Sequence, residues 1–314
     1  MTVLISQPRH AYGYQRGQSL IALIYHPTAG STPEPTSERM IFKYLHLRFP
    51  YKRFIFQSLA IRQKKGKITM AWEEIAEDKR ARLASTIPKE WLLKSPATEL
   101  SVMDYPKKSG ILSTEELAIT ESSATDLVDK MAAGQLTSVA VTTAFCKRAA
   151  LAHQLVSSTK FHLTGFLLTE NQVNCALEFF PEKALERAQE LDDHLKTTGK
   201  PVGPLHGLPI SLKDQFRIKG LETSMGYVSW IGKYETENST LVDLLLNAGA
   251  VFYVKTSVPQ SLMAGETINN IIGRTVNPRN KNLSPGGSSG GEGAIVAFRG
   301  GIIGVGTDIG KLQK

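Results

Sequence analysis

Apolar positions recur at helical spacing along the middle of the chain and predict a series of amphipathic helices. The first is expected to begin at Trp72, along one side of a strongly charged segment, and to stop before Pro88. A second is expected to follow Ser123, with Asp126 three residues later as the acid of a capping box and Gly134 as its stop.

Two further helices are expected where the same spacing returns after short breaks. One begins at Thr137 or Ser138, and the other covers residues 181–196 and is closed by Gly199. In the four helices the side chains expected to face inward are Trp72, Ile75, Ala76, Leu83, Leu127, Val128, Met131, Val139, Phe145, Cys146, Ala149, Ala184, Leu185, Ala188, Leu191 and Leu195.

Short apolar runs then alternate with a helical one. Residues 208–212 and 251–255 are expected to be buried strands, and residues 239–248 an intervening helix that ends at Gly249. A further strand is expected over residues 173–180. This alternation indicates an α/β layer architecture. The inner side of the intervening helix is expected to carry Leu241, Leu244, Leu245 and Ala248.

Positive charge is concentrated in residues 1–69, which hold 11 Lys+Arg and two acids, whereas the remainder holds 26 Lys+Arg and 27 Asp+Glu. The excess positive charge therefore belongs to a leader, which is expected to be disordered or spurious. The rest of the chain is nearly neutral, so its charge does not predict nucleic-acid binding. The leader is either a mitochondrial presequence or upstream sequence translated from a wrong start, and the second interpretation favours a cytoplasmic protein. The domain proper is expected over residues 70–314, with residues 156–172 as an insertion that breaks the helix-strand pattern.

The chain gives no sign of a membrane span, a disulfide framework or a metal site. The longest apolar run near the start covers residues 20–25, far short of the roughly 20 residues that a span needs. Cys146 and Cys175 have no partner at metal-ligand spacing, and two thiols make no disulfide framework. Both are expected to be packing residues, and no metal or cofactor is expected.

A glycine-serine loop over residues 284–293 is the strongest chemical signal, and it reads Ser-Pro-Gly-Gly-Ser-Ser-Gly-Gly-Glu-Gly. Such a loop permits tight turns and close approach of the backbone to a ligand. Alone, it fits a phosphate cradle or a flexible loop, but it lacks the Lys-Ser/Thr ending of a nucleotide P-loop. It runs into residues 294–298, which indicates a helix with serines at its positive end.

Lys213 stands at the end of an apolar strand, in the segment 206–214 that reads His-Gly-Leu-Pro-Ile-Ser-Leu-Lys-Asp. It is either a surface lysine whose stem covers apolar neighbours, or a partly buried amine that desolvation keeps neutral and able to accept a proton. Residues 304–310, Gly-Val-Gly-Thr-Asp-Ile-Gly, are expected to form a glycine-flanked turn whose N–H groups can line an oxyanion hole.

Together these segments resemble the amidase-signature family, most closely its fungal acetamidase-like and general amidases. The resemblance covers residues 71–310 apart from 156–172, and it includes connecting sequence at 120–126, 254–260 and 269–278. It implies the N-terminal part of an α/β fold, with a twisted mixed sheet flanked by helices. It also implies hydrolysis of a carboxylic amide to a carboxylate and ammonia or an amine, by a Ser-Ser-Lys triad and without a cofactor.

The same resemblance assigns roles to single residues. Lys213 would be the neutral base, Ser288 on a cis peptide would relay the proton, and a second serine would attack the amide carbonyl. Ile309 and Gly310 are placed at the oxyanion hole, Leu262 at a substrate-lining backbone position, and Ser289 and Asp308 among residues that support the loops.

The sequence departs from the family pattern after Gly310, where the family continues with glycine and the nucleophilic serine. Here Lys311 follows, and Leu312 stands at the nucleophile position, 24 residues after Ser288. Leucine has no nucleophilic atom, so we expect this chain to be inactive and incomplete at its C-terminus. We attribute this break and the one at 156–172 to translated intron sequence.

Three functions fit these observations. The first is an amide hydrolase, realised in the full-length form and acting on a small-molecule amide. The second is a non-catalytic truncated relative with a binding or regulatory role, and the third is a nucleotide-binding module that uses the glycine loop. The identity of the amide and the oligomeric state, a homo-oligomer included, are left open.

Overall fold

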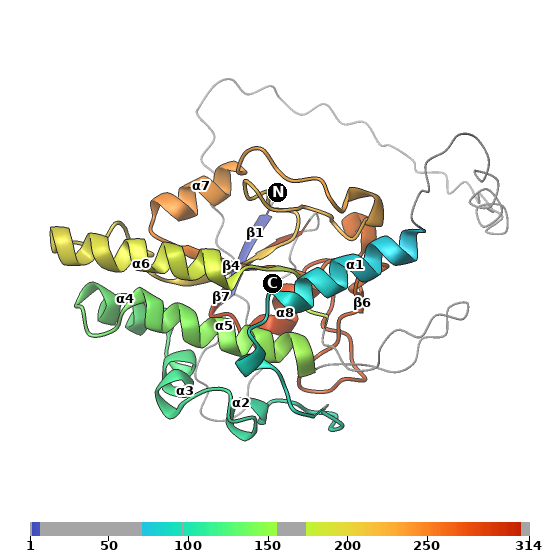
Figure 1. Ribbon diagram of the computed structural model, residues 1–314, viewed down its shortest axis with the longest axis horizontal. Coiled ribbons are helices and arrows are strands. Elements are labelled where there is room, and N and C mark those ends of the chain that lie inside the picture. The colour runs from blue at the N-terminus through green and yellow to red at the C-terminus, as the bar shows by residue number, and fades with distance from the viewer. Residues whose placement is uncertain (1, 7–70, 96, 156–173, 309–314) are drawn as a thin grey trace, which may run out of the picture. The chain divides into compact units, whose positions relative to one another are not determined.

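Five strands form a mixed sheet at the centre of the part of the chain that the structure describes (Figure 1). The computed structural model describes residues 2–6, 71–95, 97–155 and 174–308. The strands are β1 (Thr2–Ser6), β2 (Ala176–Phe179), β3 (Pro209–Lys213), β4 (Val251–Thr256) and β7 (Ile303–Asp308). The predicted insertion and the leader beyond residue 6 lie outside the described residues, so those predictions stay predictions.

The sheet has the strand order β1-β7-β3-β4-β2. The central strands β7, β3 and β4 run parallel, whereas β2 pairs antiparallel with β4 at one edge and β1 pairs antiparallel with β7 at the other. Strand β1 is an element that the composition of the leader gave no reason to expect. The predicted α/β architecture with a mixed sheet is confirmed.

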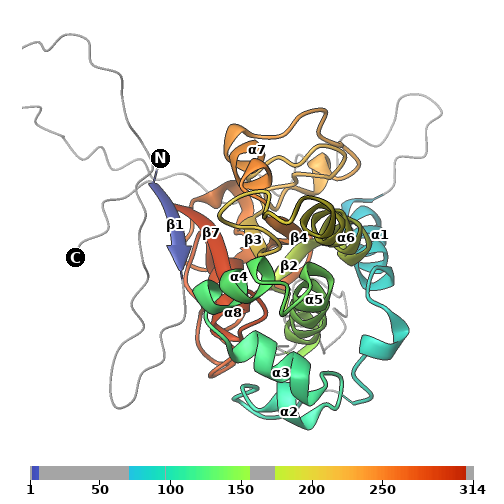
Figure 2. The same cartoon turned by 90° about the vertical axis from the view of Figure 1, so that its left-hand side faces the viewer.

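Helices cover the sheet, and Figure 2 shows α5 and α7 on opposite sides of β3 and β4. The helices are α1 (Trp72–Ser85), α2 (Tyr105–Lys108), α3 (Thr114–Glu121), α4 (Ala124–Ala132), α5 (Ser138–Leu155), α6 (Pro181–Thr198), α7 (Thr240–Asn247) and α8 (Gly290–Ala297). Short 3-10 turns lie at Lys89–Trp91, Val228–Trp230 and Gln260–Leu262, and β5 (Ile268–Asn269) pairs with β6 (Gly273–Arg274). No helix within these described ranges is long and apolar enough to cross a membrane.

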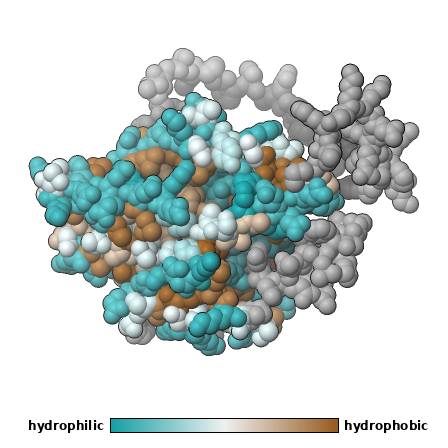
Figure 3. Space-filling view, viewed as in Figure 1, coloured by the Kyte–Doolittle hydropathy of each residue, from teal (hydrophilic) through white to brown (hydrophobic). Residues whose placement is uncertain are grey.

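Local capping explains why the predicted helix boundaries hold. The hydroxyl of Ser123 accepts from the backbone N–H of Asp126 and starts α4. Pro181 occupies the first turn of α6, and Gly199 ends that helix in the left-handed conformation at φ 69°. Hydrophilic residues dominate the surface over α1 and α6 in Figure 3, as the charged outer positions of both helices require.

Two side chains predicted to face inward are exposed instead. Trp72 is 51% exposed, and the buried position on α1 is taken by Lys79, which forms ion pairs with Glu178 and Glu222. In α7 the predicted Leu244 is 57% exposed and Val242 is buried. Apolar residues lie on several sides of this short helix, so their spacing alone did not determine which side packs.

The core joins the helices to both faces of the sheet. Cys146 and Cys175 are fully buried and unpaired, which confirms them as packing residues.

Residues 304–308 form most of β7, so the expected glycine-flanked turn is wrong for this part of the segment. Its glycines serve close approach within a strand: a Cβ at Gly304 would lie 2.0 Å from the carboxyl of Glu292.

Candidate active site

Three segments that are far apart in the sequence meet at one end of the parallel strands. Lys213 ends β3 and Thr307 lies near the end of β7, so both lie at the same edge of the sheet. Ser288 lies in the glycine-serine loop just before α8, and the peptide bond between Gly287 and Ser288 is cis. The structure thus brings the predicted base and the predicted relay together.

Lys213 is fully buried, which excludes the alternative of a surface lysine. Its Nζ lies 2.7 Å from Ser288 Oγ, 2.9 Å from Thr307 Oγ1 and 3.1 Å from Thr307 O. Burial lowers the pKa of Lys213 to about 8, although the charges of Asp308 and Glu292 act in the opposite direction. A substantial fraction of the amine is therefore neutral near pH 8, as a base requires.

Ser289 joins the glycine-serine loop to β7. Its hydroxyl donates to Thr307 O at 3.1 Å and accepts from Thr307 N–H at 3.2 Å. These bonds give Ser289 the loop-supporting contacts expected of it. They also hold the backbone of Thr307 beside Lys213, so that the amine meets a fixed carbonyl and a fixed hydroxyl.

Glycines allow this loop to lie against its neighbours without room for a side chain. A Cβ on Gly287 would lie 2.4 Å from Ala264 O, and one on Gly291 would lie 2.3 Å from Ser257 N. The hydroxyl of Thr267 donates to Gly286 O at 2.9 Å. The position of Ser288 is therefore set by close backbone packing on both sides of it.

Glu292, in the first turn of α8, places a carboxyl beneath the site. It accepts hydrogen bonds from Ser211 Oγ at 2.6 Å and from Thr256 Oγ1 at 2.7 Å, and so joins α8 to β3 and β4. Burial raises the pKa of Glu292 to about 7, against the two hydroxyl donors and the charge of Lys213, which lower it.

Asp214, the residue after Lys213, forms a buried ion pair with Lys255. Asp214 Oδ1 lies 3.0 Å from Lys255 Nζ, and both side chains are almost completely inaccessible to solvent. Each residue of the segment 222–225 contributes one hydrogen bond to this pair. The pair thereby ties the loop after β3 to β4, which anchors the end of the strand that carries Lys213.

The remaining predicted site residues are placed only in part. Leu262 has φ 60° and follows Ser261 at φ 69°, so two consecutive residues adopt the left-handed conformation that is uncommon outside glycine. It packs against the core and precedes the segment 264–266 that contacts Gly287. Its role in substrate binding stays a prediction. Ile309, Gly310 and Leu312, assigned to the oxyanion hole and the nucleophile position, lie outside the described residues.

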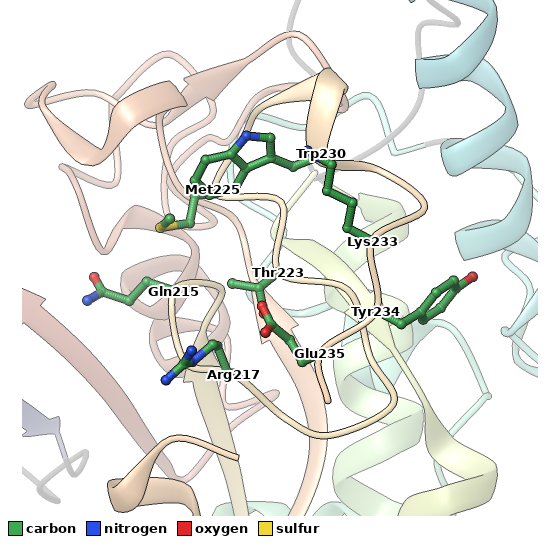
Figure 4. Close-up of a pocket in the computed structure, with 8 residues that line it drawn as sticks. All are labelled: Gln215, Arg217, Thr223, Met225, Trp230, Lys233, Tyr234 and Glu235. Atoms are coloured by element: carbon green, nitrogen blue, oxygen red, sulfur yellow. The ribbon is translucent and has the colours of Figure 1, made fainter. Parts of the chain in front are cut away.

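A pocket of about 470 Å³ lies beside the site, in the loop between β3 and α7. Figure 4 shows Gln215 and Arg217 on one side of it and Lys233 and Tyr234 on the other. Its lining residues are Gln215, Arg217, Thr223, Met225, Trp230, Lys233, Tyr234 and Glu235. Neither Lys213 nor Ser288 lines it, but Gln215 accepts a hydrogen bond from Thr307 and so connects its wall to Lys213.

Sequence reasoning did not identify Thr307, Gln215 or Glu292 as individual site residues. All three lie inside or next to the segments that carried the chemical signal, and Gln215 is two positions after Lys213. Their contacts with Lys213 and its neighbours depend on tertiary packing.

Within the described residues, no group of three or more His, Cys, Asp or Glu side chains is arranged to hold a metal ion.

Comparison with known proteins finds similarity to amidases. A family model described as Amidase matches residues 161–311. The chain is 65% identical over 240 residues to an acetamidase of Emericella nidulans, and 63% identical over 240 residues to an acetamidase of Aspergillus oryzae. Each match covers 76% of this chain and 41% of the relative, so the chain spans about two fifths of their length.

Comparison of the fold with solved structures also finds an amide hydrolase. A solved structure of fatty acid amide hydrolase superimposes with a TM-score of 0.68 at 43% sequence identity, covering 76% of this chain and 40% of that one. The residues that the family model matches, 161–311, contain Lys213 and the glycine-serine loop in the order that the resemblance predicted. Over the part that these comparisons match, the chain is therefore similar to amidases in both sequence and fold.

Proposed function

We propose that Lys213 and Ser288 form the proton-relay part of a site that hydrolyses carboxylic amides. The observation that carries this proposal is the contact of 2.7 Å between Ser288 Oγ and the fully buried Nζ of Lys213. A neutral buried amine next to a hydroxyl is an arrangement that can withdraw a proton from a nucleophile. The similarity to acetamidases supports an amide as the substrate class.

In the proposed reaction a second serine attacks the amide carbonyl carbon. Its proton passes to Ser288 as the proton of Ser288 passes to Lys213, and a new C–O bond forms. The C–N bond then breaks, and Lys213 returns the proton through Ser288 to the leaving nitrogen. Water hydrolyses the acyl-enzyme by the same relay and releases the carboxylate.

The nucleophile of this scheme has no counterpart at the expected position, where the sequence has Leu312. We therefore propose that the 314-residue chain does not turn over amides, because an aliphatic side chain offers no atom to attack the carbonyl. Loss of the nucleophile costs about 10⁶ in turnover in an enzyme with a Ser-His-Asp triad. The chain would then retain the relay without the attacking group.

Two measurements test these statements. Ammonia release from acetamide by the purified chain is expected to equal the rate without enzyme, and a fluorophosphonate probe is expected to leave it unlabelled. A double variant, Lys311→Gly with Leu312→Ser, restores the glycine-serine sequence of the family and is expected to be labelled at residue 312. The same variant with Lys213→Met is expected to lose the label, with circular dichroism as the control for folding.

Different results would contradict different parts of the proposal. Labelling of the unsubstituted chain at Ser288 would show that this serine is itself a nucleophile, against the relay role. Hydrolysis of acetamide by the unsubstituted chain would refute its inactivity. Labelling at residue 312 that persists after Lys213→Met would remove the lysine from the mechanism.

A further inference from the structure

Gln215 determines which groups donate and which accept in the hydrogen bonds around Lys213. Lys213 Nζ has two contacts with Thr307, one with its carbonyl oxygen and one with its hydroxyl. The hydroxyl of Thr307 in turn donates to Gln215 Oε1 at 2.5 Å. A carbonyl or carboxamide oxygen carries no proton, so the bonds to Thr307 O and to Gln215 Oε1 can run in one direction only.

This chain of bonds restricts the neutral amine. The one proton of the Thr307 hydroxyl is directed at Gln215, so Thr307 Oγ1 must accept from Lys213. A neutral amine has two N–H groups and one lone pair, and both N–H groups are then used on Thr307. The lone pair is left for the third partner, Ser288 Oγ at 2.7 Å, which must donate its hydroxyl proton.

We propose that Gln215 is a positioning residue which, through the hydroxyl of Thr307, turns the lone pair of Lys213 toward Ser288. This inference rests on the proposed function, because it explains how the base is aimed at its relay. Without an acceptor at position 215, the Thr307 hydroxyl would turn and donate to the lone pair itself. Lys213 would then be capped by Thr307 and lost to Ser288.

The proposal predicts a change in the titration of Lys213. When Lys213 is charged it has no lone pair, so in a Gln215→Met variant the buried Thr307 hydroxyl would have no acceptor from either neighbour. An unsatisfied buried donor disfavours that state, so the titration midpoint of Lys213 should fall by roughly one pH unit. The charged groups that act on Lys213 are Glu292 of α8 and Asp308 of β7, and both are retained in the variant.

The measurement is a pH titration by nitrogen NMR of the full chain labelled with ¹⁵N-lysine. The Lys213 signal is identified by its displacement in Ser288→Ala. Gln215→Met is expected to lower the midpoint, and Gln215→Glu, which keeps an acceptor oxygen for Thr307, is not. The exposed Gln189→Met is the matched control for the same change of side chain elsewhere.

A double-mutant cycle separates this role from a merely structural one. In a Thr307→Val background the hydroxyl is absent, so Gln215→Met should cause no further shift. An unchanged midpoint in Gln215→Met, or a shift that persists in the Thr307→Val background, would overturn the proposal. A midpoint of the unsubstituted chain near the ordinary lysine value would instead count against Lys213 as a base, whereas the shift between variants still decides the role of Gln215.

Discussion

A buried carboxyl at the start of α8 is expected to make the stability of this fold depend on pH. The pKa of Glu292 in the folded chain is about 7, against an ordinary value of 4.5, because burial disfavours its charged form. A raised folded-state pKa contributes stability that is fully present below the unfolded value and is lost as pH rises through the folded value. The free energy of unfolding should therefore fall between about pH 5 and pH 8.

The magnitude follows from the two pKa values. The interval from 4.5 to about 7 corresponds to about 3 kcal/mol when it is fully titrated. Glu292→Gln is the suitable perturbation, because an amide, like a protonated carboxyl, presents an acceptor oxygen and a donor. Both hydroxyl partners also have a backbone carbonyl at 3.4 Å, so each can turn its proton there and accept from residue 292.

Urea unfolding followed by circular dichroism, at pH 5 and pH 8, measures the effect. The stability of the unsubstituted chain relative to Glu292→Gln is expected to fall by about 2–3 kcal/mol over this interval, because the variant lacks the titrating group. Glu182→Gln, which removes an exposed carboxyl in the first turn of α6, is the matched control. An equal difference at both pH values would show that Glu292 does not titrate in this range and would refute the reasoning.

Two further predictions concern packing and buried charge, and both are measured by urea unfolding. Gly291→Ala places a Cβ 2.3 Å from a backbone nitrogen and should cost about 1–3 kcal/mol, whereas Gly265→Ala, with open space around it, should change stability by less than about 0.5 kcal/mol. Asp214→Asn leaves Lys255 buried without its charge partner and should cost about 3–5 kcal/mol, and equal losses in Asp214→Asn and the exposed Asp78→Asn would contradict this.

The fold was largely predictable where local signals agreed with one another. In α6, the proline in the first turn, the regular apolar spacing and Gly199 at the end all point to the same helix, and the structure confirms it. The strand that ends at Lys213 was predictable because a run of buried apolar residues precedes a charged one. Leu244 was misplaced because α7 is short and apolar on several sides, so periodicity could not select its inner face.

The arrangement of the site was less predictable, because its contacts join residues far apart in the chain. Lys213 and Ser288 are 75 positions apart, and Lys213 and Thr307 are 94 positions apart. A motif can identify such residues, but it gives neither the direction of a hydrogen bond nor the part played by Gln215. Glycine also conceals structure: Gly304 and Gly306 interrupt the β-branched residues of β7 and weaken its strand signal, and at Gly304 only a bare backbone fits beside Glu292.

Hydrogen bonds to Glu292 fix the position of α8 relative to β3 and β4. A leucine at position 292 would fill the space without the desolvation cost of a carboxyl, but it would make no directed bond to Ser211 or Thr256. The two bonds from Glu292 fix the first turn of α8 against β3 and β4, and Ser288 lies immediately before that turn. Because Lys213 lies two residues beyond Ser211 on β3, the same bonds also help set the distance from Lys213 to Ser288.

We therefore expect Glu292→Leu to displace Ser288 from Lys213 even where it raises the free energy of unfolding, and the ¹⁵N chemical shift of Lys213 reports that displacement. A Lys213 signal in Glu292→Leu identical to that of Glu292→Gln would show that packing alone, without these bonds, sets the contact.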